Sequence, residues 1–345
     1  MLYRLTALRH ELSKNYLPAD QLLRAYDLVP GLLAFQHRSL AKLITLLEST
    51  RAEHRRIGRA LVQAMQALEP RQAYRIGITG VPGVGKSTFI DALGLLVRGQ
   101  GLKLAVLAVD PTSPISHGSI LGDSTRMTQL MADPSVFIRP SPSGLAYGGV
   151  TRSSRQSIAA CEVFGFDVIL VETVGVGQSE YSVHGMVDAF VTLMLPNAGD
   201  ELQGVKKGLL EITDLVVVNK ADGAFRAAAE QAVTQYHHSL GPSSIAGWQR
   251  PVLLTSAAEK KGLEEVWQAL RGFQNLCQVN GAWQERRAAQ RVSELGEALE
   301  EQWLLMQSQG DFASERKRLE EALAQDTVSL PEAVQGLMGK LSLPI

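Results

Sequence analysis

The sequence predicts an α/β fold, in which a mostly parallel, doubly wound sheet is flanked by helices at the N-terminus and by a helical segment at the C-terminus. Near-continuous apolar runs recur between residues 74 and 254, as expected for strands buried on both faces of a parallel sheet. The segments between these runs have helical length, which predicts crossover helices and hence a doubly wound sheet. The six runs are 74–79, 105–109, 168–171, 189–194, 215–218 and 252–254.

The chain of 345 residues is long enough for two or three domains. Its formal net charge of −1 gives no electrostatic reason to expect nucleic acid or an anionic membrane as a partner. No apolar run approaches the ~20 residues of a membrane span, and the start of the chain does not read as a signal peptide. The two cysteines, Cys161 and Cys277, form no C-x-x-C pair. We therefore expect a cytoplasmic protein.

Three parts are predicted along the chain. Residues 1–70 carry an apolar stripe at helical spacing, which favours a helical layer packed on the core over a partner-binding arm. Residues 71–275 hold the predicted sheet. Residues 276–345 are helical in pattern, and Ser329 is expected to cap a last short helix. On the residues alone, this C-terminal region either covers its own domain or pairs with a second copy of the chain.

A glycine-rich turn between the first run and the helix that follows it indicates a triphosphate site. The pattern is G-x-x-x-x-G-K-S in the order strand, turn, helix. This context distinguishes a phosphate-binding loop from a chance match to the pattern. Lys86 is expected to reach the β- and γ-phosphates, and the Ser87 hydroxyl to ligate Mg²⁺, while backbone N–H groups at the helix N-terminus face the phosphates. The residues predicted to bind nucleotide here are Gly80, Val81, Pro82, Gly83, Val84, Gly85, Lys86, Ser87 and Thr88.

The string N-K-A-D, directly after the fifth run, indicates that the base is guanine. Asp222 can accept hydrogen bonds from N1–H and the exocyclic amino group of guanine, whereas adenine offers the wrong donors. Asn219 and Lys220 are expected to brace the loop and flank the base. Ser256 and Ala257, after the sixth run, fit the backbone contact to guanine O6. The predicted ligands are therefore GTP and GDP.

Three carboxylates are expected to complete the site. Glu172 and Asp110 each follow an apolar run, and Asp123 lies in the loop beyond Asp110. Several carboxylates near a triphosphate require a cation between them, or act as a base on the attacking water. A structural cap is the alternative role for Asp123. The predicted metal ligands are Ser87, Asp110, Asp123 and Glu172, and the predicted catalytic residues are Lys86, Asp110, Asp123 and Glu172.

The segment after Glu172 is predicted to be a switch. The N–H of Gly175 can bond the γ-phosphate, and this link breaks on hydrolysis. Val176 stands where many GTPases place a glutamine that orients water, and valine cannot do so. We therefore expect slow intrinsic GTP hydrolysis, with Gln178 as the candidate for the missing role.

Together these residues resemble the MeaB/ArgK-type GTPases of the SIMIBI class, over about residues 40–345. The most specific strings are E-T-V-G-V-G-Q-S-E at 172–180 and L-Q-G-V-K-K-G at 202–208. The resemblance implies a P-loop GTPase that serves an adenosylcobalamin-dependent acyl-CoA mutase, above all methylmalonyl-CoA mutase, as a chaperone. Its role would be to gate cofactor delivery and to protect the mutase. It also implies that the C-terminal helices form a homodimer.

The resemblance further implies three switches, at 110–125, 172–182 and 196–207. Ser124 departs from the family pattern, which commonly has lysine there, and residues 1–35 have no counterpart that we can place. Two alternatives use the same core fold or motif. A metallochaperone GTPase for nickel enzymes requires a Cys/His site that the sequence does not display. A P-loop kinase or transport ATPase would turn over ATP as well as GTP.

Overall fold

A computed structural model describes residues 2–15, 17–109, 127–140, 147–173, 179–196, 207–307 and 310–339. The chain divides into two compact units, Met1–Arg287 and Ala288–Ile345. Asp110, Asp123, Gly175 and Val176 lie outside the described residues. Among the helices that the structure does describe, none is both long enough and apolar enough to cross a membrane.

The first unit is built on a seven-stranded sheet in which all neighbouring strands run parallel. The strands are β1 (Tyr74–Gly80), β2 (Leu104–Val109), β3 (Phe137–Arg139), β4 (Val168–Thr173), β5 (Ala189–Met194), β6 (Leu215–Val218) and β7 (Val252–Leu254). Their order is β3-β2-β4-β1-β5-β6-β7. The predicted fold class is confirmed, and β3 is a strand that the apolar runs did not reveal. Because β1 lies at the centre with the order reversing around it, the carboxyl end of β1 is where a ligand is expected.

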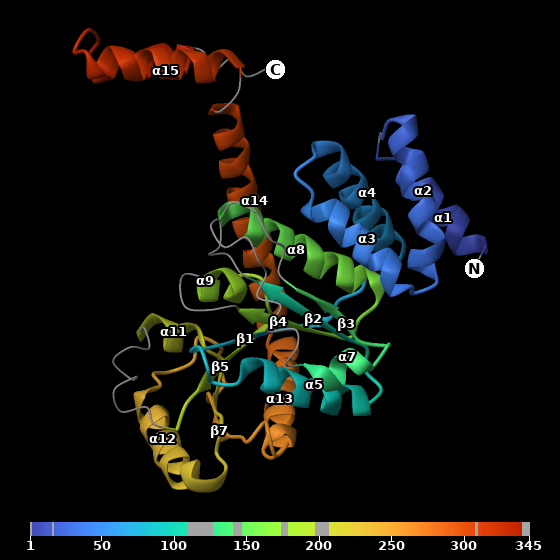
Figure 1. Ribbon diagram of the computed structural model, residues 1–345, viewed down its shortest axis with the longest axis vertical. Coiled ribbons are helices and arrows are strands. Elements are labelled where there is room, and N and C mark those ends of the chain that lie inside the picture. The colour runs from blue at the N-terminus through green and yellow to red at the C-terminus, as the bar shows by residue number, and fades with distance from the viewer. Residues whose placement is uncertain are drawn as a thin grey trace. The chain divides into compact units, whose positions relative to one another are not determined.

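Helices cover both faces of the sheet (Figure 1). The helices of this unit are α1 (Leu2–Ser13), α2 (Ala19–Leu33), α3 (His37–Glu48), α4 (Ala52–Leu68), α5 (Lys86–Gly99), α7 (Thr128–Ala132), α8 (Tyr147–Phe164), α9 (Ser179–His184), α11 (Lys207–Ile212), the 3₁₀ turn η1 (Gly223–Phe225), α12 (Arg226–Ser239), α13 (Leu263–Val279) and the start of α14 (Ala282–Gln307). One core lies between the sheet, α8 and the N-terminal helices. A second core lies between the sheet, α5 and α13.

The N-terminal helices form a layer on α8. Leu40, Leu43, Ile44 and Leu47 lie on one face of α3, and all four are buried in the first core. α3 and α4 both pack on α8, and α1 and α2 pack on α4. The apolar stripe of this region therefore faces the rest of the unit, which agrees with the helical layer expected from its periodicity.

Buried ion pairs stabilise the edge of the sheet that is formed by the amino-terminal ends of its strands, called here the amino-terminal edge. Asp188, just before β5, accepts from the guanidinium groups of Arg75 in β1 and Arg287 in α14, each at 2.6 Å. Asp214, just before β6, accepts from Arg286 at 2.8 and 2.9 Å. Burial would raise the pKa of Asp188, but the guanidinium groups of Arg75 and Arg287 outweigh it and lower that pKa. The start of α14 is therefore fixed to this edge by ion pairs with Asp188 and Asp214.

The second unit contains the rest of α14 together with α15 (Gly310–Ala324) and α16 (Leu330–Gly339). α15 packs on α16. Both the backbone N–H and the hydroxyl of Ser329 donate to Oε2 of Glu332, at 3.0 and 2.7 Å, which is part of a capping box. The short last helix predicted after Ser329 is therefore present. Val292 and Leu299 on α14 are exposed, at 72% and 61%.

Candidate nucleotide site

The glycine-rich turn leaves the carboxyl end of β1 and leads into α5 at Lys86. At Gly80 the backbone has φ +150°, and a Cβ there would lie 2.6 Å from the carbonyl oxygen of Leu193. At Gly85 the backbone has φ +93°, and a Cβ would lie 2.9 Å from the side-chain amide nitrogen of Asn219. Both positions therefore require glycine, because a side chain would be strained and would push the turn off its neighbours.

Ser87 and Glu172 meet at the first turn of α5. The Ser87 hydroxyl lies 3.3 Å from Oε1 of Glu172, and both side chains are buried. In the sheet, Glu172 of β4 lies beside Ile78 of β1, which explains how residues 85 positions apart come together. A hydroxyl and a carboxylate side by side are the oxygen donors that Mg²⁺ takes in proteins, so these two residues fit that cation.

A buried pair of threonines ties these two strands together behind the turn. The hydroxyl of Thr173, next to Glu172, donates to the hydroxyl of Thr79 at 2.9 Å. Both side chains are almost fully buried. This pair was not predicted, although a polar residue at or next to the end of each of two buried strands is a visible signal. The pair fixes the turn relative to the strand that carries Glu172.

The Lys86 ammonium lies over the turn, and its Nζ donates to the carbonyl oxygen of Gly80 at 2.9 Å. A lysine at the first residue of α5 is placed where the helix N-terminus already contributes partial positive charge. The combination of ammonium, helix N-terminus and glycine backbone favours a polyphosphate.

Asn219 connects the glycine-rich turn to the loops that follow β6 and β7. Its Nδ2 donates to the carbonyl oxygen of Val84 at 2.9 Å. Its Oδ1 accepts from the Thr255 hydroxyl and from the Ala257 N–H, both at 3.1 Å. Asn219 is 2% exposed, so these bonds are shielded from water. The side chain therefore braces both loops, as its sequence position suggested.

Asp222 lies three residues after Asn219 in the loop that follows β6, and it is half-buried. The Ser256 hydroxyl donates to Oδ2 of Asp222 and accepts from the N–H of Glu259, the latter at 3.2 Å. Lys220 adopts a left-handed backbone with φ +61°, an unusual conformation for a residue with a side chain. Only a backbone contact was predicted for Ser256, and the contact of its hydroxyl with Asp222 was not predicted.

The described residues therefore bring Lys86, Ser87 and Glu172 to one end of the site and Asn219 and Asp222 to the other. Asp110, Asp123 and Gly175 belong to segments outside the described residues. β2, which ends one residue before Asp110, runs beside β4 so that Val109 pairs with Thr173. Within the described part of the chain, no three His, Cys, Asp or Glu side chains gather as a metal site would require.

A family model described as methylmalonyl Co-A mutase-associated GTPase MeaB matches residues 40–311. The chain belongs to this family. Its relatives include a putative GTPase of Caulobacter vibrioides, 49% identical over 75% of this chain and 79% of that protein. GTPase ArgK of Escherichia coli is 43% identical over 78% of this chain and 82% of its own length. The methylmalonic aciduria type A homolog of Mus musculus is 43% identical over 76% of this chain and 66% of its own length.

Among solved structures, a LAO/AO transport system kinase superimposes with a TM-score of 0.71. It is 33% identical and covers 92% of this chain and 98% of its own. The MeaB/ArgK resemblance inferred from the strings is thus confirmed. Several relatives are named GTPases, and this member of the family is a GTPase that binds guanine nucleotide.

Proposed function

We propose that this GTPase gates the delivery of adenosylcobalamin to an acyl-CoA mutase, with methylmalonyl-CoA mutase as the first candidate, and protects that mutase. The observation that carries the proposal is the family match over residues 40–311, whose description names the mutase. Relatives named for methylmalonic aciduria support the same partner. The nucleotide bound at the guanine site then sets the conformation of the switch segments, and these act on the mutase so that it keeps an intact cofactor.

At the phosphate end, we propose that Lys86 binds the β- and γ-phosphates and that Ser87 and Glu172 hold Mg²⁺ with Asp110 and Asp123. The cation, when bound, neutralises charge on the phosphate oxygens. The adjacent Ser87 hydroxyl and Glu172 carboxylate support this assignment. Gly80 to Thr88 and Gly175 would supply backbone N–H groups to the phosphates.

At the base end, Asp222 reads guanine, flanked by Lys220 and braced by Asn219, with Ser256 and Ala257 near O6. The Ser256 hydroxyl on Asp222 supports this proposal, because it fixes one carboxylate oxygen in place. Replacing Asp222 with asparagine should weaken GDP binding, since the amide presents a donor to the N1–H of guanine. Xanthine carries an oxygen in place of the exocyclic amino group, so the same variant should gain affinity for XDP. An unchanged preference for GDP would remove the base-reading role.

We further propose slow intrinsic turnover, because Val176 cannot orient water, and a homodimer through the C-terminal helices. The exposed apolar face of α14, which includes Val292, Leu295 and Leu299, supports the homodimer. We place the protein in the cytoplasm, without nucleic acid or membrane as a partner. The near-zero net charge supports the absence of nucleic acid and of an anionic membrane as partners.

The decisive experiment measures GTP hydrolysis with and without purified methylmalonyl-CoA mutase, together with co-elution in GDP or in a non-hydrolysable GTP analogue. We expect mutase-stimulated hydrolysis and nucleotide-dependent co-elution. Lys86→Ala, which should suppress hydrolysis in a folded protein, serves as the control for contaminating activity. A hydrolysis rate and an elution profile indifferent to the mutase would refute the partner while leaving the GTPase intact.

The same preparation tests the two alternatives. Stoichiometric binding of Ni²⁺ or Zn²⁺ would favour a metallochaperone. ATP turnover equal to GTP turnover would favour a kinase or transport ATPase and would contradict guanine reading by Asp222.

A further inference from the structure

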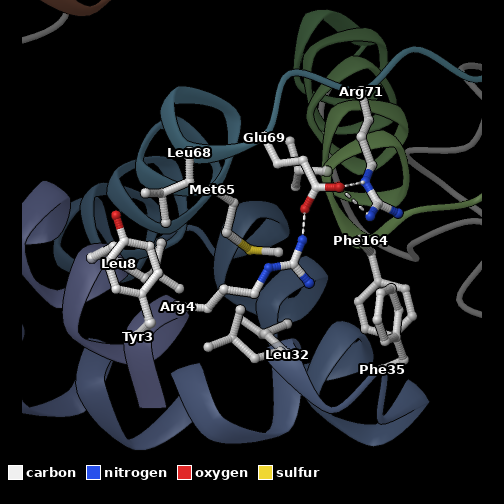
Figure 2. A pocket seen from close by; sticks show the side chains of 13 residues that line it. Tyr3, Arg4, Leu8, Leu32, Phe35, Met65, Leu68, Glu69, Arg71 and Phe164 are labelled. Atoms are coloured by element: carbon white, nitrogen blue, oxygen red, sulfur yellow. Dashed lines mark hydrogen bonds and ion pairs between the residues drawn. The ribbon is translucent and has the colours of Figure 1, made fainter. Parts of the chain in front are cut away.

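A pocket of about 300 Å³ lies between the N-terminal helices and the C-terminal end of α8 (Figure 2). It shares no residue with the nucleotide site. Its volume is at the lower end of the range found for small-molecule sites. Most of its wall is apolar and comes from α1, α2, α4 and α8, and includes Leu8, Leu32, Met65, Leu68 and Phe164.

One side of this pocket is charged. Arg4 of α1 and Arg71, which precedes β1, both reach toward the carboxylate of Glu69 (Figure 2). Nε of Arg71 donates to Oε1 of Glu69 at 3.0 Å, and Nη2 of Arg4 donates to Oε2. Two guanidinium groups thus share one carboxylate, which leaves this side of the pocket with excess positive charge. The ammonium of Lys103 lies 4.3 Å from the centre of the ring of Phe35, which lines the pocket.

Arg71 is held in position from two sides. A Cβ at Gly165 would lie 2.2 Å from its Nη1, so only glycine lets the guanidinium lie there. On another side the guanidinium lies 5.9 Å from the centre of the Phe35 ring. Phe35 in turn has a left-handed backbone with φ +54° and packs edge-on against Phe164 at 5.6 Å. The cation is therefore a built part of the pocket wall.

We propose that this pocket binds a small amphipathic carboxylate. The head group of the ligand replaces the Glu69 carboxylate between Arg4 and Arg71, and its aliphatic chain occupies the apolar wall. Guanidinium groups match carboxylates in a planar, paired geometry, and Glu69 already demonstrates that match within the chain. The side chains of Glu69 and Arg4 are 45% and 49% exposed, so their ion pair is weak and easily exchanged. An inorganic anion would gain only the contacts with the guanidinium groups, whereas an anion with an aliphatic chain also gains burial against the apolar wall.

The test uses hexanoate, octanoate and decanoate below their micellar concentrations, with binding to the full chain measured by titration calorimetry. Because the wall buries methylene groups, we expect affinity to rise about fourfold per added methylene until the chain fills the pocket. Octanol, which has the same chain without the charge, should bind at least about tenfold more weakly than octanoate. Equal binding of octanol and octanoate would overturn the carboxylate assignment, and no binding of any of the acids would overturn the site.

Variants separate the head-group contacts from the apolar wall. Arg4→Gln should weaken octanoate binding, and Glu69→Gln should strengthen it by up to about tenfold, because the internal competitor is neutralised. Ala7→Phe, on the pocket-facing side of α1, should block binding. Arg9→Gln on the same helix, where the guanidinium lies over Tyr26, is the matched control and should change nothing.

GTP hydrolysis should stay unchanged in all four variants, since none of these residues belongs to the nucleotide loops. If Ala7→Phe fails to fold, the opposite effects of Arg4→Gln and Glu69→Gln still decide the question. Equal octanoate affinity in those two variants would overturn the proposal.

Discussion

Replacing Asn219 with alanine is expected to weaken guanine-nucleotide binding by loosening two loops at once. The side chain donates to Val84 of the glycine-rich turn and accepts from Thr255 and Ala257 in the loop after β7. All three bonds lie within 3.1 Å, in a residue that is 2% exposed. After the substitution, the buried carbonyl of Val84 and N–H of Ala257 have to find other partners or move toward water.

The expected size follows from these three bonds. Each buried hydrogen bond contributes about 0.5–1.5 kcal/mol net. The loss of all three therefore lowers the free energy that stabilises the ordered loops by about 1.5–4.5 kcal/mol. Nucleotide binding has to restore this order. Since about 1.4 kcal/mol corresponds to a tenfold change, the dissociation constant for GDP should rise by about ten- to a thousandfold.

The assay is titration calorimetry with GDP, combined with thermal unfolding in the absence of nucleotide. Asn219→Asp keeps the accepting oxygen but places a second oxygen against the Val84 carbonyl, so it isolates the link to the glycine-rich turn. Asn280→Ala is the matched control, because Asn280 also donates and accepts, at 3.1 and 3.0 Å, but in an exposed turn outside the nucleotide loops. A folded Asn219→Ala protein that binds GDP within twofold of the original would refute the reasoning.

Three further outcomes are expected. Glu172→Gln should lower the apparent Mg²⁺ affinity in GTP hydrolysis about tenfold or more, as read from Mg²⁺ titrations, and an unchanged titration would remove Glu172 from the cation site. Arg287→Ala should destabilise the first unit by about 3–5 kcal/mol in denaturant unfolding, because it leaves buried Asp188 short of a partner. Arg291→Ala, an exposed arginine on the same helix, should cost less than about 0.5 kcal/mol. Burial lowers the pKa of His184 below 6.5, so the folded state resists protonation. Stability should therefore be constant above pH 6.5 and fall as the pH drops through the folded-state pKa. His184→Gln should flatten that fall, and an equal slope in both proteins would contradict the assignment.

The sheet was predictable because its strands are buried on both faces. In β2, for example, Leu104 and Val106 enter one core while Leu107 and Val109 enter the other, which leaves an unbroken apolar run in the sequence. β3 escaped prediction because one of its three residues is the charged Arg139, so the strand forms no apolar run. β7 has the same length and lies at the other edge of the sheet, but its three residues are all apolar and it was predicted.

The site was predictable where a motif fixes residues relative to a strand end. The glycine-rich turn and Asn219 are of this kind, because each follows its strand directly. The contact between Ser256 and Asp222 was not predictable, since it depends on how the loops after β6 and β7 approach one another. The pairing of Arg287 with Asp188 joins residues 99 positions apart, and nothing local in either segment points to the other.

The amino-terminal and carboxyl ends of the strands form two opposite edges of the sheet, and these two edges have different roles. At the amino-terminal edge, Asp188 is clamped between two guanidinium groups, so the starts of β1 and β5 are held firmly to α14. At the carboxyl edge, β2, β4 and β5 each lead directly into one of the three predicted switches, 110–125, 172–182 and 196–207. We therefore expect a partner that senses the nucleotide state to contact the carboxyl edge, and not the edge at which α14 begins.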